Sequence, residues 1–567
     1  MKITIGDYLI KRLKELGIRH LIGVPGDFNL QFLEQVRATD GLDFVGASNE
    51  LNAAYAADGY AREHGISAFC VTYGVGDLGA LPGVAGSAAE MIPVIMISGA
   101  PPLYATKHNI PVHHSLADGD FSNIMNCFEE FTADRTMLTQ ENAQEEIDRM
   151  IRTALRTRRP VTIHVPSNLS YLEIDADDAP LADIAHESDG ERLDAATKAI
   201  TNHFSRAKQP AVLIDMPVDR LGIAEDLLSF IEKTQTPFAS LSTGKAILNE
   251  SHPLYLGSYG GDSSDEGVQE RIENADFLLT VAPRFIEGNS GGYSADLPED
   301  DTIWLARNHT FVGEEAFEGV AVKDVLQRVT EQLPEKQETQ EKKADRPKQE
   351  KPDADAKIRQ ENFWERMQSF LQKGDRVFAE TGTSSQGIGS IRLPDDVSYV
   401  ASHVWGAIGY TLPALYGSLL ANPDRRQVLF IGDGSFQVTA QALSRILYEE
   451  QNPVIFVINN DGYTIERYIM GMQADYNDIP AWTYHKLPEL FSDNSKMLTF
   501  DVHTHGDLED ALEKAAGATH GVLIEVHMHR EDAPEALKEF GPMTAEFNYG
   551  PRGPENEETE TEREEQA

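Results

Sequence analysis

The chain has 567 residues, too many for one hydrophobic core, so we predict three domains of ordinary size. Its 92 acidic and 49 basic residues give a formal net charge of −43, which excludes a nucleic-acid partner because phosphates would be repelled. The acids are spread along the chain, which indicates a surface adapted to high salt, where ions screen their mutual repulsion.

The first 17 residues predict an amphipathic helix in which charges interrupt the apolar positions, unlike the apolar segment of a signal peptide. No run reaches the roughly 18 apolar residues that span a bilayer. We therefore expect a cytoplasmic protein without a membrane partner. Cys70 and Cys127 stand among apolar or helical neighbours and are predicted to be buried thiols.

Residues 1–182 alternate strand-like runs such as "SAFCVTYG" and "IPVIMISG" with helical ones, which is typical of a parallel sheet covered by helices. The same alternation recurs in residues 190–333 and 359–545. The fold class is therefore α/β, with three doubly wound parallel-sheet domains. Residues 334–358 are dense in charge and proline and predict a linker, and residues 546–567 form an acidic tail predicted to be disordered.

The segment "YGVGDLG" contains Gly74, Gly76 and Gly79 in the spacing of a dinucleotide-binding turn. Such a site also needs an acid at the end of the next strand. The following strand, "IPVIMISGAPP", ends without one. We favour a tight turn that lets the backbone approach another ligand.

A stronger signal lies in the third domain, where the buried run "VLFIGDGS" ends on Asp433. The next strand ends on Asn459 and Asn460, so an acid and an amide follow neighbouring strands. With a backbone carbonyl near Gly462, these oxygens suit Mg²⁺, which takes further oxygens from phosphate. The glycines and Ser435, which can cap the next helix, favour a diphosphate. Taken alone, the Gly-Asp-Gly motif has an alternative interpretation as a plain tight turn.

The pair of motifs, GDG at Asp433 followed by Asn459 and Asn460, resembles the thiamine diphosphate signature, and two further segments suit the other end of that cofactor. Its aminopyrimidine needs a carboxylic group in a dry site to reach the imino tautomer. Glu50 follows a strand directly and is nearly free of charged neighbours, although a first-turn glutamate is the simpler alternative. In "HVWGAIGY", Gly406 can present its carbonyl and Ile408 can bend the cofactor; alone, Ile408 would be a core residue.

With these motifs in order, the chain from about residue 3 to 545 resembles the thiamine diphosphate-dependent pyruvate and indolepyruvate decarboxylases. The family's double histidine is present in "HHSLADGDF", "GVPGDFN" supplies an acid, and "AETGTS" and "NNDGYTIE" follow. The resemblance implies proton relay by Asp27, His114 and Glu466, with His113 orienting the set. The alternatives are an N-cap role for Asp27 and solvent-facing loop positions for the histidines.

The resemblance also implies the cofactors, thiamine diphosphate and Mg²⁺. The residues that would hold them are, for thiamine diphosphate, Glu50, Thr72, Val75, Thr381, Thr383, Gly406, Ile408, Asp433, Gly434, Ser435, Asn460 and Ile465, and, for the metal, Asp433, Asn460 and Gly462. It implies a pyrimidine-binding, a middle and a diphosphate-binding domain. The active site would form between two subunits, so a homodimer or homotetramer is expected.

The expected reaction is non-oxidative decarboxylation of a 2-oxo acid to the aldehyde and CO₂. "AETGTS" favours pyruvate, whereas Gln386 in place of an aromatic residue and Met470 in place of histidine alter the predicted pocket, which Ile465 and Ile469 would also line. Indolepyruvate, phenylpyruvate or branched-chain 2-oxo acids are alternative substrates. A carboligase, a flavin-containing oxidase and a catalytically silent cofactor binder are the alternative functions.

Overall fold

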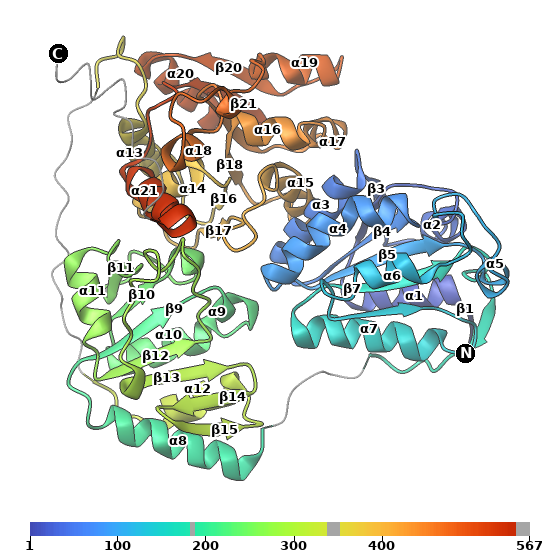
Figure 1. Cartoon of the computed structure of the whole chain (residues 1–567), viewed down its shortest axis with the longest axis horizontal. Helices are drawn as coiled ribbons and strands as arrows, with labels where there is room; N and C mark the ends of the chain where they lie inside the picture. Colours follow the sequence, from blue (N-terminus) through green and yellow to red (C-terminus); the bar gives the residue numbers. More distant parts are fainter. Residues whose placement is uncertain (182–187, 337–351, 551–567) are drawn as a thin grey trace.

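The computed structural model describes residues 1–181, 188–336 and 352–550, which form three α/β domains (Figure 1). Most of the predicted linker and acidic tail lies outside these residues. The end of the linker segment packs on the C-terminal domain, where Ile358 is buried and the Ala356 carbonyl accepts a hydrogen bond from the His505 N–H. Helix α21 (Glu535–Tyr549) extends past residue 546, where the acidic tail was predicted to begin. Among the described residues, no helix is both long and apolar enough to cross a membrane.

The N-terminal domain is built on a parallel six-stranded sheet with the order β3-β2-β4-β5-β7-β6. Its strands are β2 (His20–Gly23), β3 (Asp43–Gly46), β4 (Ser67–Thr72), β5 (Val94–Ala100), β6 (Asp134–Met137) and β7 (Val161–Pro166), with β1 (Lys2–Thr4) and β8 (Glu173–Asp175) pairing separately. Its helices are α1 (Ile5–Glu15), α2 (Leu30–Arg37), α3 (Glu50–His64), α4 (Val75–Ala89), α5 (Leu103–Lys107), α6 (Ser122–Cys127) and α7 (Ala143–Thr157). Cys70 is buried as predicted, but Cys127 is exposed because it ends the short surface helix α6.

The middle domain has a seven-stranded sheet with the order β11-β10-β9-β12-β13-β14-β15. Its elements are α8 (Gly190–Phe204), β9 (Pro210–Ile214), α9 (Pro217–Arg220), α10 (Ala224–Thr234), β10 (Phe238–Ser240), β11 (Tyr255–Ser258), α11 (Glu266–Glu273), β12 (Phe277–Val281), β13 (Thr302–Ala306), β14 (His309–Val312), β15 (Glu315–Glu318) and α12 (Val322–Gln332). Unlike the predicted parallel sheet, β14 and β15 form an antiparallel edge hairpin. These strands are partly exposed and polar, so they lack the continuous apolar run of a parallel strand.

The C-terminal domain has a parallel sheet with the order β17-β16-β18-β19-β21-β20. Its strands are β16 (Arg376–Ala379), β17 (Ser398–Val400), β18 (Gln427–Gly432), β19 (Val454–Asn459), β20 (Leu498–Val502) and β21 (Val522–His527). Its helices are α13 (Gln360–Phe370), α14 (Thr383–Ser390), α15 (Thr411–Ala421), α16 (Asp433–Thr439), α17 (Ala442–Tyr448), α18 (Thr464–Ile469), α19 (Leu487–Phe491), α20 (His505–Ala516) and α21 (Glu535–Tyr549). Short 3₁₀ turns include η4 (Tyr484–Lys486).

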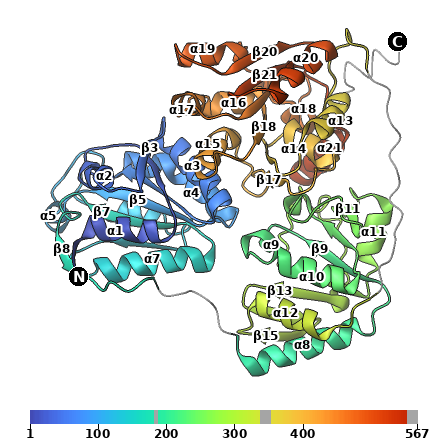
Figure 2. The same cartoon turned by 180° about the vertical axis from the view of Figure 1, so that it is seen from behind.

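Helices α3 and α15 pack side by side and join the N-terminal and C-terminal domains (Figures 1 and 2). The backbones approach closely, because a Cβ at Gly59 would collide with the Ala414 carbonyl. The Tyr410 hydroxyl donates to Asp58 at 2.5 Å within this buried contact. One hydrophobic core therefore runs across both domains.

Candidate active site

The turn between β2 and α2 brings Asp27 together with the predicted histidine pair. His113 Nε2 lies 2.8 Å from Asp27 Oδ2, and His114 Nε2 lies 3.8 Å from Oδ1. Phe28, which the sequence did not single out, stacks on the His113 ring at 4.9 Å. Asp27 is not an N-cap, because α2 begins at Leu30 with Asn29 in the cap position. The three side chains form one partly exposed cluster, in which His113 and Asp27 are hydrogen-bonded.

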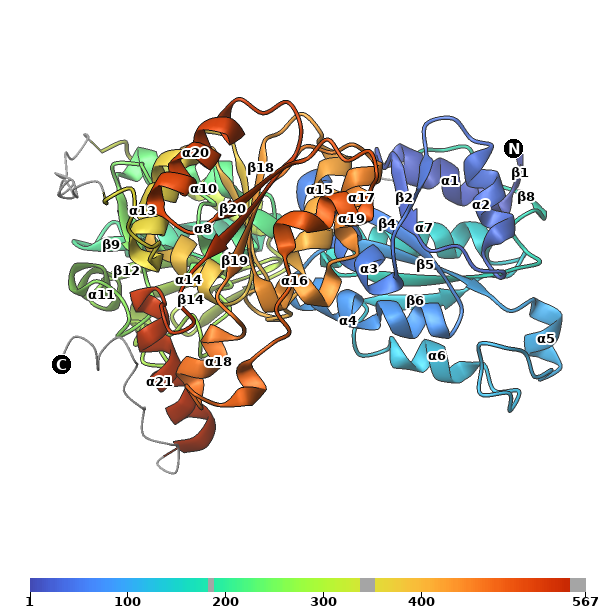
Figure 3. The ribbon, with the colours of Figure 1, turned by 90° about the horizontal axis from the view of Figure 1, so that it is seen from above.

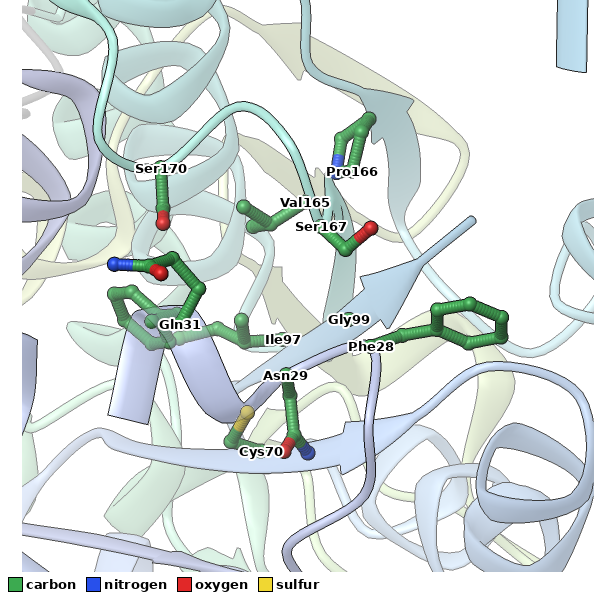
Figure 4. A pocket seen from close by; sticks show the side chains of 11 residues that line it. Phe28, Asn29, Gln31, Cys70, Ile97, Gly99, Val165, Pro166, Ser167 and Ser170 are labelled. Carbon is green, nitrogen blue, oxygen red and sulfur yellow. The ribbon is translucent and has the colours of Figure 1, made fainter. Parts of the chain in front are cut away.

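Packing beneath the turn fixes the position of Asp27. Asn29 accepts a hydrogen bond from the Gly26 N–H at 2.9 Å and donates to the Val24 carbonyl. Figure 4 shows Asn29 beside the Cys70 sulfur, with the Phe28 ring directed away from them. The small pocket that these residues line has no space for a water molecule. The turn is thus anchored by packing, and this pocket is not a ligand site.

The glycine motif of β4 and α4 supports both the histidine loop and Glu50. Gly74 has φ +68°, and a Cβ there would collide with the His114 carbonyl. Its N–H donates to Asp77 at 2.7 Å, a fully buried carboxyl whose pKa is raised by burial to about 7. A Cβ at Gly76 would lie 3.5 Å from Glu50 Oε1. The glycines therefore form a turn that leaves room for the His114 backbone and the Glu50 side chain; the approach of another ligand to this turn stays a prediction.

Glu50 is the first residue of α3 and is half-buried. Asn49 caps the helix by accepting a hydrogen bond from the Asn52 N–H at 2.8 Å, so the Glu50 carboxylate is not needed for capping. Thr72 lies at the end of β4 with a buried hydroxyl that has no hydrogen-bond partner, and Val75 is 56% exposed. An unpartnered buried hydroxyl and an exposed apolar side chain both fit a bound organic group.

In the C-terminal domain, Asp433 is buried directly after β18. Its Oδ1 accepts from the Gly434 N–H at 2.7 Å, and its Oδ2 accepts from the N–H groups of Asn460 and Gly462, each at 3.2 Å. Burial raises the Asp433 pKa to about 7, although these backbone donors lower it. The carboxyl is therefore costly to ionise unless a cation is nearby.

The side-chain amide of Asn460 can adopt two orientations, which differ in whether its nitrogen or its oxygen faces Asp433. One of its terminal atoms lies 3.2 Å from Asp433 Oδ1 and 3.1 Å from the Gly462 carbonyl oxygen. With nitrogen there, the amide donates to both oxygens. With oxygen there, three oxygens converge at spacings close to the roughly 2.9 Å edge of an octahedral Mg²⁺ site. The predicted metal ligands thus lie together, and their donor set fits Mg²⁺.

The remaining predicted residues of this half surround the same strand ends. Gly434 faces the Tyr463 ring and leaves no space for a Cβ. Ser435 does not cap a following helix as predicted, because α16 already begins at Asp433 and includes Ser435 in its first turn. Gly406 is exposed and Ile408 is partly buried.

Glu380 is a residue that the sequence reasoning missed. It is fully buried at the end of β16, and burial raises its pKa to about 7. Its carboxylate accepts hydrogen bonds from the N–H of Thr381 at 3.0 Å and from the N–H and hydroxyl of Thr411 at 3.1 and 2.7 Å. It therefore links the segment of Thr381 and Thr383 to the loop that follows Ile408. The sequence did contain a signal for Glu380, namely an acid directly after an apolar strand, which is the same signal that identified Asp433.

Glu466 is exposed in the first turn of α18, and Ile465 lies against Gly382. Both belong to the C-terminal domain, whereas Asp27 and the histidines belong to the N-terminal domain. The predicted site residues therefore form two half-sites, one in each domain. We call the set of Asp27, Glu50, Thr72, Val75, His113 and His114 the N-terminal half-site and the set of Glu380, Gly406, Ile408, Asp433, Asn460, Gly462 and Glu466 the C-terminal half-site.

Comparison with known proteins assigns all three domains. The N-terminal TPP binding domain of thiamine pyrophosphate enzymes matches residues 3–124, the central domain matches residues 197–333, and the C-terminal TPP binding domain matches residues 381–526. An alpha-keto-acid decarboxylase of Mycolicibacterium paratuberculosis is 38% identical over 541 residues, covering 95% of this chain and 96% of the relative. One from Mycobacterium tuberculosis is 38% identical over 542 residues, covering 94% and 96%.

Among solved structures, benzoylformate decarboxylase from Polynucleobacter necessarius superposes with a TM-score of 0.77 over 94% of this chain and 99% of that chain. At 17% identity this likeness shows the fold alone. The matched domains and the near full-length relatives together show the family. The chain thus belongs to the thiamine pyrophosphate enzymes, within the family of thiamine diphosphate-dependent 2-oxo acid decarboxylases.

Proposed function

We propose that the protein decarboxylates pyruvate to acetaldehyde and CO₂ with thiamine diphosphate and Mg²⁺. The observation that carries this proposal is the pair of half-sites, an oxygen cluster suited to a metal-bound diphosphate and a carboxylate beside a cluster of proton donors. Thiamine diphosphate, when bound, supplies the electron sink for the bond that releases CO₂. The protein itself would hold the cofactor and the metal ion and would transfer protons.

At the diphosphate end, Asp433, Asn460 and the Gly462 carbonyl would hold Mg²⁺. Cation binding would favour the ionised form of Asp433, whose pKa is raised without it. At the other end, Glu50 would hold the pyrimidine through a hydrogen bond. Its position against the glycine backbone of α4 supports this role, because a Cβ at Gly79 would lie 3.4 Å from Glu50 Oε2 and a larger residue there would displace the carboxylate.

Protons would be handled by Asp27, His114 and Glu466. His113 holds Asp27 at 2.8 Å and is itself stacked on Phe28, so it can orient the carboxylate. A carboxylate and two imidazoles at this spacing can exchange a proton and deliver it to the reacting carbon before the aldehyde leaves. Glu466 would reach the same substrate from the C-terminal half-site.

The proposal is tested by CO₂ release from pyruvate, indolepyruvate, phenylpyruvate and branched-chain 2-oxo acids, with and without both cofactors. We expect the highest kcat/KM with pyruvate and no turnover after both cofactors are stripped. A higher kcat/KM for an aromatic acid would refute the substrate assignment and leave the reaction class intact. Undiminished turnover by the stripped protein would refute the reaction class as well.

We further propose that each active site is completed by a second copy of the chain. Within one chain, α3 and α15 occupy the contact between the two domains, while apolar side chains close in sequence to half-site residues stay exposed. Val75 is 56% and Leu78 46% exposed on one side, and Trp405 is 40% and Val438 41% exposed on the other. Pairing the half-sites between two copies would bury these groups and exclude water from the cofactor.

Subunit complementation tests this arrangement. Glu50→Gln and Asp433→Asn chains are each expected to be inactive, but a heterodimer has one composite site that retains both residues. Random re-pairing should restore about a quarter of wild-type activity, because half of the dimers are mixed and each has one intact site. A mixture no more active than its two components would refute a shared site.

A further inference from the structure

A group of three histidines and two carboxylates lies at the edge of the C-terminal sheet. Strands β20 and β21 pair in parallel with Asp501 opposite Glu525. Because side chains alternate along a strand, His503 and His527, each two residues further on, extend from the same face. His485, in the turn η4, completes the group. None of these residues belongs to either half-site.

The distances converge on one atom, Asp501 Oδ1. It lies 2.8 Å from His527 Nε2, 3.2 Å from His503 Nε2 and 3.7 Å from His485 Nδ1. The rings of His503 and His527 stack at 4.0 Å with an angle of 8° between them, so their Nε2 atoms face the carboxylate together. Two imidazole nitrogens and a carboxylate oxygen therefore share one small volume.

These ligand types suit a tetrahedral metal ion, and the two stacked rings would tilt apart on binding so that both nitrogens face the ion in their ring planes. Zn²⁺ binds nitrogen and oxygen ligands at about 2.0–2.2 Å, so neighbouring ligand atoms in a tetrahedral site lie about 3.4 Å apart. The separations of Asp501 Oδ1 from the Nε2 atoms of His503 and His527 are 3.2 and 2.8 Å, so the side chains would have to move apart by about 0.2 and 0.6 Å to reach this value. Imidazole ligands favour zinc over magnesium or calcium.

Burial and charge support the same conclusion. Glu525 is 1% exposed, and it accepts from His485 Nδ1 at 2.7 Å and from Asn459 Nδ2 at 2.7 Å. Its Oε1 lies 3.6 Å from His527 Nε2, within reach of a fourth ligand position. With neutral imidazoles the group carries two negative charges, which one divalent cation neutralises. The strand β20 is at the edge of the sheet (Figure 3), and the side chains of Asp501 and His503 are exposed, so an ion can enter from solvent.

We infer that Asp501, His503 and His527 form a zinc-binding site, with Glu525 at the fourth position and His485 supporting Glu525. The site lies one strand away from the predicted Mg²⁺ ligands, since Asn459 joins Glu525 to the end of β19. Zinc would clamp the edge strand β20 to β21 and so stabilise the sheet that carries the diphosphate end. It takes no part in the reaction itself.

The test uses the full-length protein saturated with thiamine diphosphate and excess Mg²⁺, so that the magnesium site is filled. Zn²⁺ is titrated against a chromophoric chelator, and Co²⁺ is substituted to obtain an absorption spectrum diagnostic of tetrahedral coordination. We expect one Zn²⁺ per chain and a rise in melting temperature on its addition. In the His503→Gln/His527→Gln double variant, the affinity for Zn²⁺ should fall more than about 100-fold, and the thermal shift should be lost.

Two control variants distinguish this site from other histidine–carboxylate groups. His203→Gln removes an isolated pair with Asp301, 2.9 Å long, and His113→Gln removes a histidine of the Asp27 cluster. Both should retain the zinc stoichiometry and the Co²⁺ spectrum. The inference is overturned if the double variant binds Zn²⁺ like wild type, or if His113→Gln abolishes binding. Absence of a stoichiometric site in the wild-type protein would overturn it as well.

Discussion

The raised pKa of Asp433 predicts a pH dependence of cofactor binding. A metal ion needs the ionised carboxylate, and burial holds the Asp433 pKa at about 7 when no metal is bound. The ionised fraction is about nine-tenths at pH 8 and about one-tenth at pH 6, so the apparent affinity for Mg²⁺ should fall about tenfold between them. This loss corresponds to about 1.4 kcal/mol of binding free energy.

The direction of the pH effect on Mg²⁺ affinity follows from the direction of the Asp433 pKa shift. Because the pKa is raised, lowering the pH through 7 protonates a group that the metal must deprotonate, and binding weakens. Asp461 contributes to the raised pKa through its negative charge. In Asp461→Asn the midpoint should therefore move to lower pH, while the affinity at pH 8 stays close to that of wild type.

Isothermal titration calorimetry with Mg²⁺ at saturating thiamine diphosphate measures this dependence. Titrations in buffers of different ionisation enthalpy count the protons released, and the same titration of free thiamine diphosphate corrects for its own phosphate ionisation. About half a proton per metal should come from the protein at pH 7. A corrected affinity that is constant from pH 6 to 8 would refute the raised pKa and the metal role of Asp433.

Four further predictions concern catalysis, packing and salt. Glu50→Gln should lower kcat for CO₂ release at least about 100-fold, whereas the exposed Glu34→Gln should not change it. Glu380→Gln places an amide group opposite N–H donors; chemical denaturation should show a loss of about 1–3 kcal/mol of unfolding free energy, together with weaker thiamine diphosphate binding. Gly59→Val should destabilise the contact of α3 with α15 by at least about 1–3 kcal/mol, whereas Gly190→Ala, which meets no atom within 4 Å, should leave the melting temperature nearly unchanged. Circular dichroism should show better retention of structure in molar salt than in dilute buffer, because the charge of −43 is then screened.

The parts of the fold that sequence predicted well are those set by local patterns. The apolar runs became strands, and the residues just after them, including Asp433 and Asn460, lie where parallel strands end. The edge hairpin of the middle domain was not predicted because half-exposed edge strands lack a continuous apolar run. Helix boundaries near glycine were also uncertain, as the start of α16 shows.

Contacts between distant residues could not be read from sequence. Asp27 and His113 are 86 residues apart, and only the folded chain shows that they share a hydrogen bond. The zinc-site residues were missed for the same reason, since Asp501 and His527 become neighbours through the register of two strands. A residue type can indicate a chemistry, but strand pairing decides which residues meet.

The N-terminal and C-terminal domains have the same strand order when their strands are numbered from the first of each sheet. Their carboxyl strand ends are therefore equivalent positions, yet one presents the carboxylate of Glu50 and the other the oxygen cluster of Asp433. In a single chain Glu50 is only half-buried, and the apolar Val75 and Val438 are exposed. In the proposed dimer, burial against the complementary half from a second copy would exclude water, strengthen each hydrogen bond to the cofactor, and give association a direct hydrophobic driving force. On this view, catalysis and dimer formation depend on the same surface, and a variant that weakens one should weaken the other.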